Sequence, residues 1–151
     1  MISNYVLDCN TIISAHILPN SVSSKAFEKA FQKGTILCTE EILNEFSVAY
    51  LRPKFEKYIP AKRRVLDIRN FKNRVKIITV DKKVKICRDE ADDKYLALAL
   101  FGNVSCIITG DHDLRVLNPF RGILILSPGE FLITFDNSLN LNEPLVIYEK
   151  Q

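Results

Sequence analysis

Five short apolar runs alternate along the chain with longer stretches of helical periodicity. The runs are rich in β-branched and aliphatic residues, which is typical of strands that are buried on both faces. They occupy residues 4–7, 35–38, 75–80, 105–109 and 122–126. Because strands alternate with helices, the sequence predicts a three-layer α/β/α fold with a mainly parallel, Rossmann-like central sheet.

Capping and stop residues delimit the helices between these runs. Ser23 or Ser24 can cap the first helix, which Gly34 ends, and a loop is expected between the first strand and this helix. Thr39 can cap the second helix, which Pro53 ends. The remaining helices are expected over residues 60–73, from Asp89 or Asp92 to residue 101, and from residue 128.

The length and the apolar runs bound the organisation of the chain. The 151 residues suit one domain. No apolar run is long enough to cross a bilayer, and Asp8 and Asn10 interrupt any secretory signal, so we expect a cytoplasmic protein with no membrane contact. Residues 1–135 are expected to form the domain. Residues 136–151 are expected to form a polar tail that could add an edge strand or contact a partner.

Charge is unevenly distributed along the sequence, although the formal net charge is only +3. Residues 52–88 contain 14 basic and three acidic residues, a formal charge of +11, and the rest of the chain carries −8. Such a segment suits contact with a polyanion, and its alternative is a solvated helix face.

Acidic residues follow two of the predicted strands. Asp8 ends the first strand, and Asp111 and Asp113 follow the strand at residues 105–109. In open α/β sheets, ligands bind outside the carboxyl ends of the strands, at the point where the strand order reverses. Acids from the two strand ends can therefore converge.

Two further acids lie on the predicted helices. Glu45 borders the apolar face of its helix, and helical periodicity places Asp92 on an apolar face with Asp93 nearer the edge. No basic residue is evidently placed to neutralise these acids. Two carboxylates 4 Å apart repel by about 4 kcal/mol at an effective dielectric of 20, so such a cluster favours a cation. All-oxygen ligands suit Mg²⁺ or Mn²⁺, which can activate water against a phosphodiester.

Five motifs in order give the chain a family resemblance. They are VLDCNTIISA (6–15), TEEILNE (39–45) with LRPK (51–54), RDEADDKYLALA (88–99), ITGDHDL (108–114) and SPGEF (127–131). This set resembles the PIN-domain family, and within it the VapC-like toxins of bacterial and archaeal toxin–antitoxin systems. The resemblance covers residues 4–132. Cys9 departs from the Thr or Ser that the family often has there.

The resemblance implies a metal-dependent endoribonuclease that is restrained by a small antitoxin protein and often forms a homodimer. Its acidic pattern carries over to Asp8, Glu45, Asp92 and Asp111 as catalytic residues. Asp8, Asp92 and Asp111 would hold Mg²⁺ or Mn²⁺, with Asp113 as a further metal residue. Supporting roles fall to Asn10, Thr11 and Asp93, and the residues expected to contact the RNA phosphates are Arg52, Lys54, Lys62, Arg63 and Arg64.

Two other functions fit parts of the pattern. A phosphatase of the haloacid-dehalogenase type also has a nucleophilic Asp after its first strand, but its motif needs an acid where Asn10 stands and Thr where Ile12 stands. A non-catalytic RNA- or protein-binding domain is the second alternative. The retained acids argue against that alternative.

Overall fold

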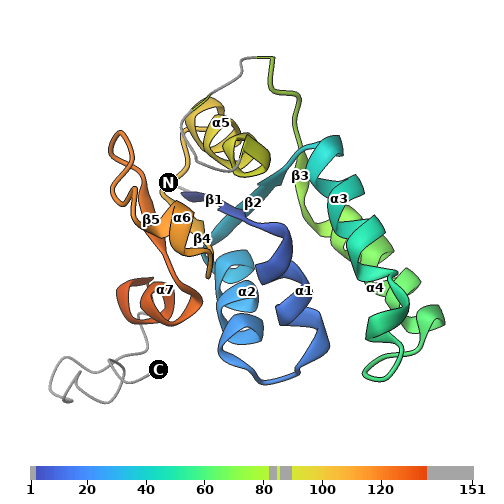
Figure 1. Ribbon diagram of the computed structural model, residues 1–151. Helices are drawn as coiled ribbons and strands as arrows, with labels where there is room; N and C mark the ends of the chain where they lie inside the picture. The colour runs from blue at the N-terminus through green and yellow to red at the C-terminus, as the bar shows by residue number, and fades with distance from the viewer. Residues whose placement is uncertain (1–2, 82–84, 86–89, 136–151) are drawn as a thin grey trace, which may run out of the picture.

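A five-stranded parallel sheet forms the centre of the computed structural model, which describes residues 3–81, 85 and 90–135. Its strands are β1 (Ser3–Leu7), β2 (Gly34–Cys38), β3 (Lys76–Ile77), β4 (Cys106–Ile108) and β5 (Leu124–Leu126), in the order β3-β2-β1-β4-β5. Figure 1 shows α5 on one side of this sheet and α1 and α2 on the other. The predicted three-layer α/β/α fold is therefore confirmed.

The helices of the described residues connect these strands. They are α1 (Cys9–Ile17), α2 (Val22–Lys33), α3 (Glu40–Tyr50), α4 (Ala61–Arg74), α5 (Asp93–Phe101), α6 (His112–Arg115) and α7 (Pro128–Phe135), with 3₁₀ turns η1 (Pro53–Phe55) and η2 (Glu90–Asp92). None of them is long and apolar enough to span a membrane. The tail at residues 136–151, and Asp89 as a helix start, lie outside the described residues.

The strand order reverses at β1, which lies between β2 and β4. β1 and β4 pair in parallel, with Tyr5 opposite Cys106 and Leu7 opposite Ile108. The residues that follow these strands, Asp8 and Thr109, therefore leave the sheet side by side. This is the edge at which open α/β sheets bind ligands.

A helix stands where the sequence predicted a loop after the first strand. Asp8 caps α1 by accepting a hydrogen bond from the Thr11 amide, and Ile12 and Ile13 are buried in the core. The β-branched run Thr11–Ile13 has low helix propensity, which burial overrides here. The predicted loop was therefore wrong.

Two other expected boundaries also differ. The cap of α2 is Ser21, not Ser23 or Ser24, and its side chain accepts from the Ser24 amide. The strand expected over residues 75–80 is reduced to Lys76–Ile77, although the amide of Ile78 still bonds to the carbonyl of Cys38. Both differences leave the order of elements unchanged.

Candidate active site

The buried carboxylate of Asp8 lies at the carboxyl end of β1 and is 6% exposed. Its Oδ1 accepts a hydrogen bond from the Thr11 amide at 3.0 Å, and its Oδ2 accepts from the Thr109 hydroxyl at 2.6 Å. Because both oxygens are held, the carboxylate has a fixed orientation.

Thr109 joins Asp8 to the acids that follow β4. Its hydroxyl oxygen accepts a hydrogen bond from the Asp111 amide at 2.9 Å, and the Asp111 carboxylate caps α6 by accepting from the Asp113 amide at 3.0 Å. The structure thus brings Asp8, Asp111 and Asp113 into one hydrogen-bonded network. Sequence reasoning missed Thr109, although a polar residue at the carboxyl end of the strand predicted over residues 105–109 was the signal that could have found it.

The environment of Asp8 disfavours its negative charge. Burial raises the pKa of Asp8, hydrogen bonds from Thr109 and Thr11 oppose this rise, and the nearby charge of Asp111 adds to it. A cation beside the two carboxylates would offset both unfavourable effects.

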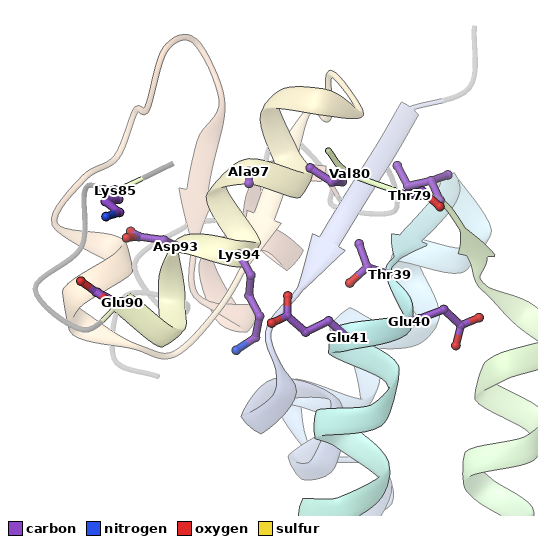
Figure 2. A pocket seen from close by; sticks show the side chains of 11 residues that line it. Thr39, Glu40, Glu41, Thr79, Val80, Lys85, Glu90, Asp93, Lys94 and Ala97 are labelled. Atoms are coloured by element: carbon purple, nitrogen blue, oxygen red, sulfur yellow. The ribbon is translucent and has the colours of Figure 1, made fainter. Parts of the chain in front are cut away.

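Glu45 lies in a second network, on α3. The Tyr95 hydroxyl donates to its Oε1, and the Lys94 ammonium donates to its Oε2 at 2.8 Å. Figure 2 shows the Lys94 side chain extending from α5 toward α3. The expectation that no basic residue neutralises the acids was therefore wrong for Glu45. Burial and the adjacent Glu45 raise the pKa of Tyr95 far above its ordinary value, so its hydroxyl keeps its proton.

Asp92 and Asp93 exchange the places that helical periodicity predicted. Asp93 is the first residue of α5 and is 6% exposed, whereas Asp92 is half-buried in η2. The prediction assumed one regular helix from Asp92, but a 3₁₀ turn rotates each residue by a larger angle than an α-helix does. The preference for Asp92 as the buried acid was therefore wrong.

Asp93 lines a pocket of about 570 Å³ between α3, α5 and the segment after β3. In Figure 2, Asp93, Glu90 and Lys85 lie at one end of this lining, and Thr39 and Glu41 lie at the other. The full lining is Thr39, Glu40, Glu41, Ile78, Thr79, Val80, Lys85, Glu90, Asp93, Lys94 and Ala97. Because Lys94 also pairs with Glu45, this pocket adjoins the second network.

The donor set fits a hard divalent cation. No three acids, histidines or cysteines within the described ranges lie close enough together to form a complete metal cage. Mg²⁺ does not require such a cage, because it is commonly bound by one or two carboxylates, waters and substrate phosphates. Asp8 and Asp111 supply carboxylates of this kind.

The two remaining supporting residues differ in position. Thr11 is 4% exposed and supports Asp8 through its backbone amide. Asn10 is exposed in the first turn of α1. Thr11 therefore belongs to the Asp8 network, whereas no hydrogen bond connects the Asn10 side chain to it in the described part of the chain.

Most of the basic residues expected at an RNA surface are exposed, namely Arg52, Lys54, Lys62 and Arg63. Arg64 is different: it is 1% exposed, and its guanidinium pairs with Glu56 and donates to the carbonyl oxygens of Tyr50 and Ile59, each at 2.9 Å, and of Arg52. A guanidinium committed to these acceptors cannot reach a phosphate. The assignment of Arg64 to RNA contact was therefore wrong, since its role is to hold the segment between α3 and α4.

Three comparisons show which known proteins this chain resembles. A PIN-domain family model matches residues 4–113, which include every acid predicted for the site. An uncharacterized protein of Methanocaldococcus jannaschii is 32% identical over 145 residues, covering 89% of this chain and 93% of that protein. A chain in the crystal structure of VapBC2 from Rickettsia felis, bound to a DNA fragment from its promoter, is similar in fold. It has a TM-score of 0.52 and 18% identity, covering 82% of this chain and 97% of that one.

Proposed function

Because the chain belongs to the PIN-domain family, as its sequence motifs indicated, we propose that it is a metal-dependent endoribonuclease and the toxin of a toxin–antitoxin pair. One observation carries the nuclease proposal. Asp8 and Asp111 follow two neighbouring parallel strands and are joined through the Thr109 hydroxyl at the edge where the strand order reverses.

The proposed ligands of Mg²⁺ or Mn²⁺ are Asp8 and Asp111, with Asp113 and Asp92 as further metal residues, directly or through water. When bound, the ion would lower the pKa of a water and offset the charge that develops on the phosphodiester. The protein's own contribution is to hold Asp8 rigid through Thr11 and Thr109. The Asp8 carboxylate therefore does not have to reorient when the substrate binds.

Glu45 is the proposed residue that orients or deprotonates the attacking water. A carboxylate has about four lone-pair sites, and Tyr95 and Lys94 each occupy one. Lone pairs therefore remain on each Glu45 oxygen to accept a hydrogen bond from water. Asp93, buried at the start of α5, is proposed to support this side of the site.

The exposed side chains of Arg52, Lys54, Lys62 and Arg63 are the proposed contacts to the RNA backbone. Phosphate contacts supply most non-specific affinity for nucleic acid and weaken with added salt. A steep loss of RNA affinity between 50 and 200 mM salt, on the order of tenfold or more, would support this surface. The control is a variant with alanine at Arg52, Lys54, Lys62 and Arg63. If its RNA affinity depends on salt as steeply as that of the wild type, these side chains form a merely solvated face.

The proposed partners are a small antitoxin protein and a second copy of this chain. Support comes from the fold shared with a chain of the VapBC2 structure. Residues 1–135 are the proposed nuclease domain, and residues 136–151 are proposed as a tail that adds an edge strand or contacts a partner. If expression of this chain is toxic to cells, coexpression of the protein encoded next to its gene should suppress that toxicity. If the neighbouring protein has no effect, the chain is not the toxin of such a pair, and the nuclease proposal alone remains.

The central test compares the purified wild type with Asp8→Asn and Asp111→Asn. The wild type should bind Mn²⁺ in calorimetry and cleave a mixed-sequence single-stranded RNA, and each variant should lose at least about 100-fold in kcat. Full cleavage by both variants would overturn the assignment. Turnover of 4-nitrophenyl phosphate without RNA cleavage would favour a phosphatase instead.

A further inference from the structure

Tyr95 connects the two acidic networks of the site. Its ring is buried, with the residue 3% exposed, and its hydroxyl lies between the backbone nitrogen of Cys9, at 3.0 Å, and the carboxylate of Glu45. Cys9 directly follows Asp8, so one hydroxyl group links α5 to both the end of β1 and α3.

The directions of these hydrogen bonds follow from their chemistry. A backbone N–H can only donate, so the Tyr95 oxygen accepts from Cys9 and its single proton goes to Glu45 Oε1. Lys94, which can only donate, occupies Oε2 and is itself held by the carbonyl of Ala91 at 2.7 Å. Glu45 therefore receives one donor on each oxygen, which fixes the plane of its carboxylate.

The start of α1 explains why a tyrosine is needed. The first amides of a helix have no acceptor within the helix. Asp8 accepts from the Thr11 amide, and Tyr95 accepts from the Cys9 amide. A group at this place must accept from Cys9 and at the same time donate to Glu45, which a hydroxyl does and a carbonyl or an ammonium does not.

We propose that Tyr95 is a positioning residue that fixes the Glu45 carboxylate relative to Asp8 through the Cys9 amide, with Lys94 as its second support. The catalytic use of this arrangement rests on the proposed nuclease function. The hydrogen-bonded chain from the Cys9 amide through the Tyr95 hydroxyl to Glu45, here called the relay, does not rest on that function. It can be tested without turnover.

The test without turnover uses backbone amide chemical shifts. Glu45→Ala should shift the Cys9 amide resonance in the wild type, because the Tyr95 hydroxyl loses its acceptor and reorients. In a Tyr95→Phe background, Glu45→Ala should leave the Cys9 resonance at least several-fold less affected. An equal response in both backgrounds would overturn the relay.

The test with turnover is a double-mutant cycle on cleavage of a mixed-sequence single-stranded RNA with Mn²⁺. Tyr95→Phe should lower kcat about 10- to 100-fold and leave KM within about twofold, as expected for a misplaced catalytic group. In a Glu45→Gln background the same change should have almost no further effect. Additive losses would overturn a role exerted through Glu45.

Tyr50 provides a matched control. Its hydroxyl also donates to a carboxylate, Asp67 Oδ2 at 2.7 Å, and its side chain is also buried, but this hydrogen bond joins α3 to α4. Tyr50→Phe should lose comparable stability and keep kcat. If kcat falls equally in Tyr50→Phe and Tyr95→Phe, the effect of Tyr95→Phe is merely structural. If the wild type does not cleave RNA, the nuclease proposal is contradicted, and the amide chemical shifts still test whether Tyr95 couples Glu45 to Cys9.

Discussion

The Thr109 hydroxyl donates to Asp8 Oδ2 at 2.6 Å, across a separation of 101 residues in the sequence. The register of β1 and β4 produces this contact, because Leu7 pairs with Ile108 and the next residue of each strand carries the polar group. The same hydroxyl accepts from the Asp111 amide. One buried side chain thus connects the carboxylate of Asp8 to the backbone of Asp111.

Replacing Thr109 by Val removes the hydroxyl and keeps the shape of the side chain, so it measures the contribution of the hydroxyl to stability. The change leaves Asp8 Oδ2 and the Asp111 amide without this partner, so we expect the free energy of unfolding to fall by about 1–3 kcal/mol. Thr109→Ser keeps the hydroxyl and should cost about 1 kcal/mol or less, the value of one buried methyl group. Urea unfolding in the presence of a chelator measures both, and equal losses would contradict the hydrogen-bonding role.

Asp8 should make stability depend on pH. Burial raises its folded-state pKa above the ordinary value of 3.8, so the folded protein binds more protons than the unfolded chain between these two values. The contribution of Asp8 to the free energy of unfolding therefore falls as pH rises from about 3.8 through the folded-state pKa. Above the folded-state pKa this contribution no longer changes with pH.

The measurement for Asp8 is urea unfolding across this pH range with a chelator, for the wild type and Asp8→Asn. The difference between the two proteins isolates Asp8 from other groups such as Glu130, whose pKa is lowered chiefly by hydrogen bonds from Ser127. The wild type should lose stability relative to Asp8→Asn as pH rises. A constant difference would contradict the raised pKa.

Arg63 and Arg64 are neighbours in sequence, but their replacement should lower the free energy of unfolding to different extents. Arg64→Met leaves the buried carbonyl of Tyr50 without its donor, so we expect a loss of about 1–3 kcal/mol in the free energy of unfolding. The Arg63 side chain is 70% exposed and pairs with Asp67, so Arg63→Met should cost less than about 0.5 kcal/mol.

RNA affinity provides the complementary measurement for this pair of variants. Arg63→Met should weaken RNA binding at low salt, whereas folded Arg64→Met should bind as the wild type does. The opposite order in RNA affinity would contradict the exposed surface proposed here.

Two glycines should differ sharply in their tolerance of a methyl group. A Cβ at Gly34 would lie 1.9 Å from the carbonyl oxygen of Ser3, a backbone atom of the paired strand, so Gly34→Ala should cost at least about 1–3 kcal/mol. A Cβ at Gly110 meets nothing within 4 Å, and Gly110→Ala should be neutral or stabilise by up to about 1 kcal/mol. Thermal unfolding of the two variants checks the contrast.

The sheet could be predicted because its strands are short apolar runs separated by clear helix signals. Helix α1 could not, because an Asp at a strand end is as typical of a turn or a helix cap as of a site, and the run Thr11–Ile13 favours a strand by propensity alone. Tertiary burial decides such a segment. Local pattern therefore predicts the architecture better than it predicts each element.

The sequence allowed the acids of the candidate site to be named, but not the residues that form hydrogen bonds with them. Asp8 and Asp111 stand at strand ends that any parallel sheet brings together. Thr109, Lys94 and Tyr95 act through contacts that span 49 to 101 residues of sequence, and no local period encodes these. Arg64 shows the converse, since a basic run does not reveal which of its members is buried.

The place of β1 in the middle of the sheet has a consequence for biosynthesis. β1 leaves the ribosome before β4, with which it pairs and whose residues are made about 100 positions later. A chain that stops before Cys106 lacks the neighbouring strand, Thr109 and Asp111, so Asp8 has nothing to face. The contact between Asp8 and Thr109 can therefore form only after β4 has been synthesised and has paired with β1.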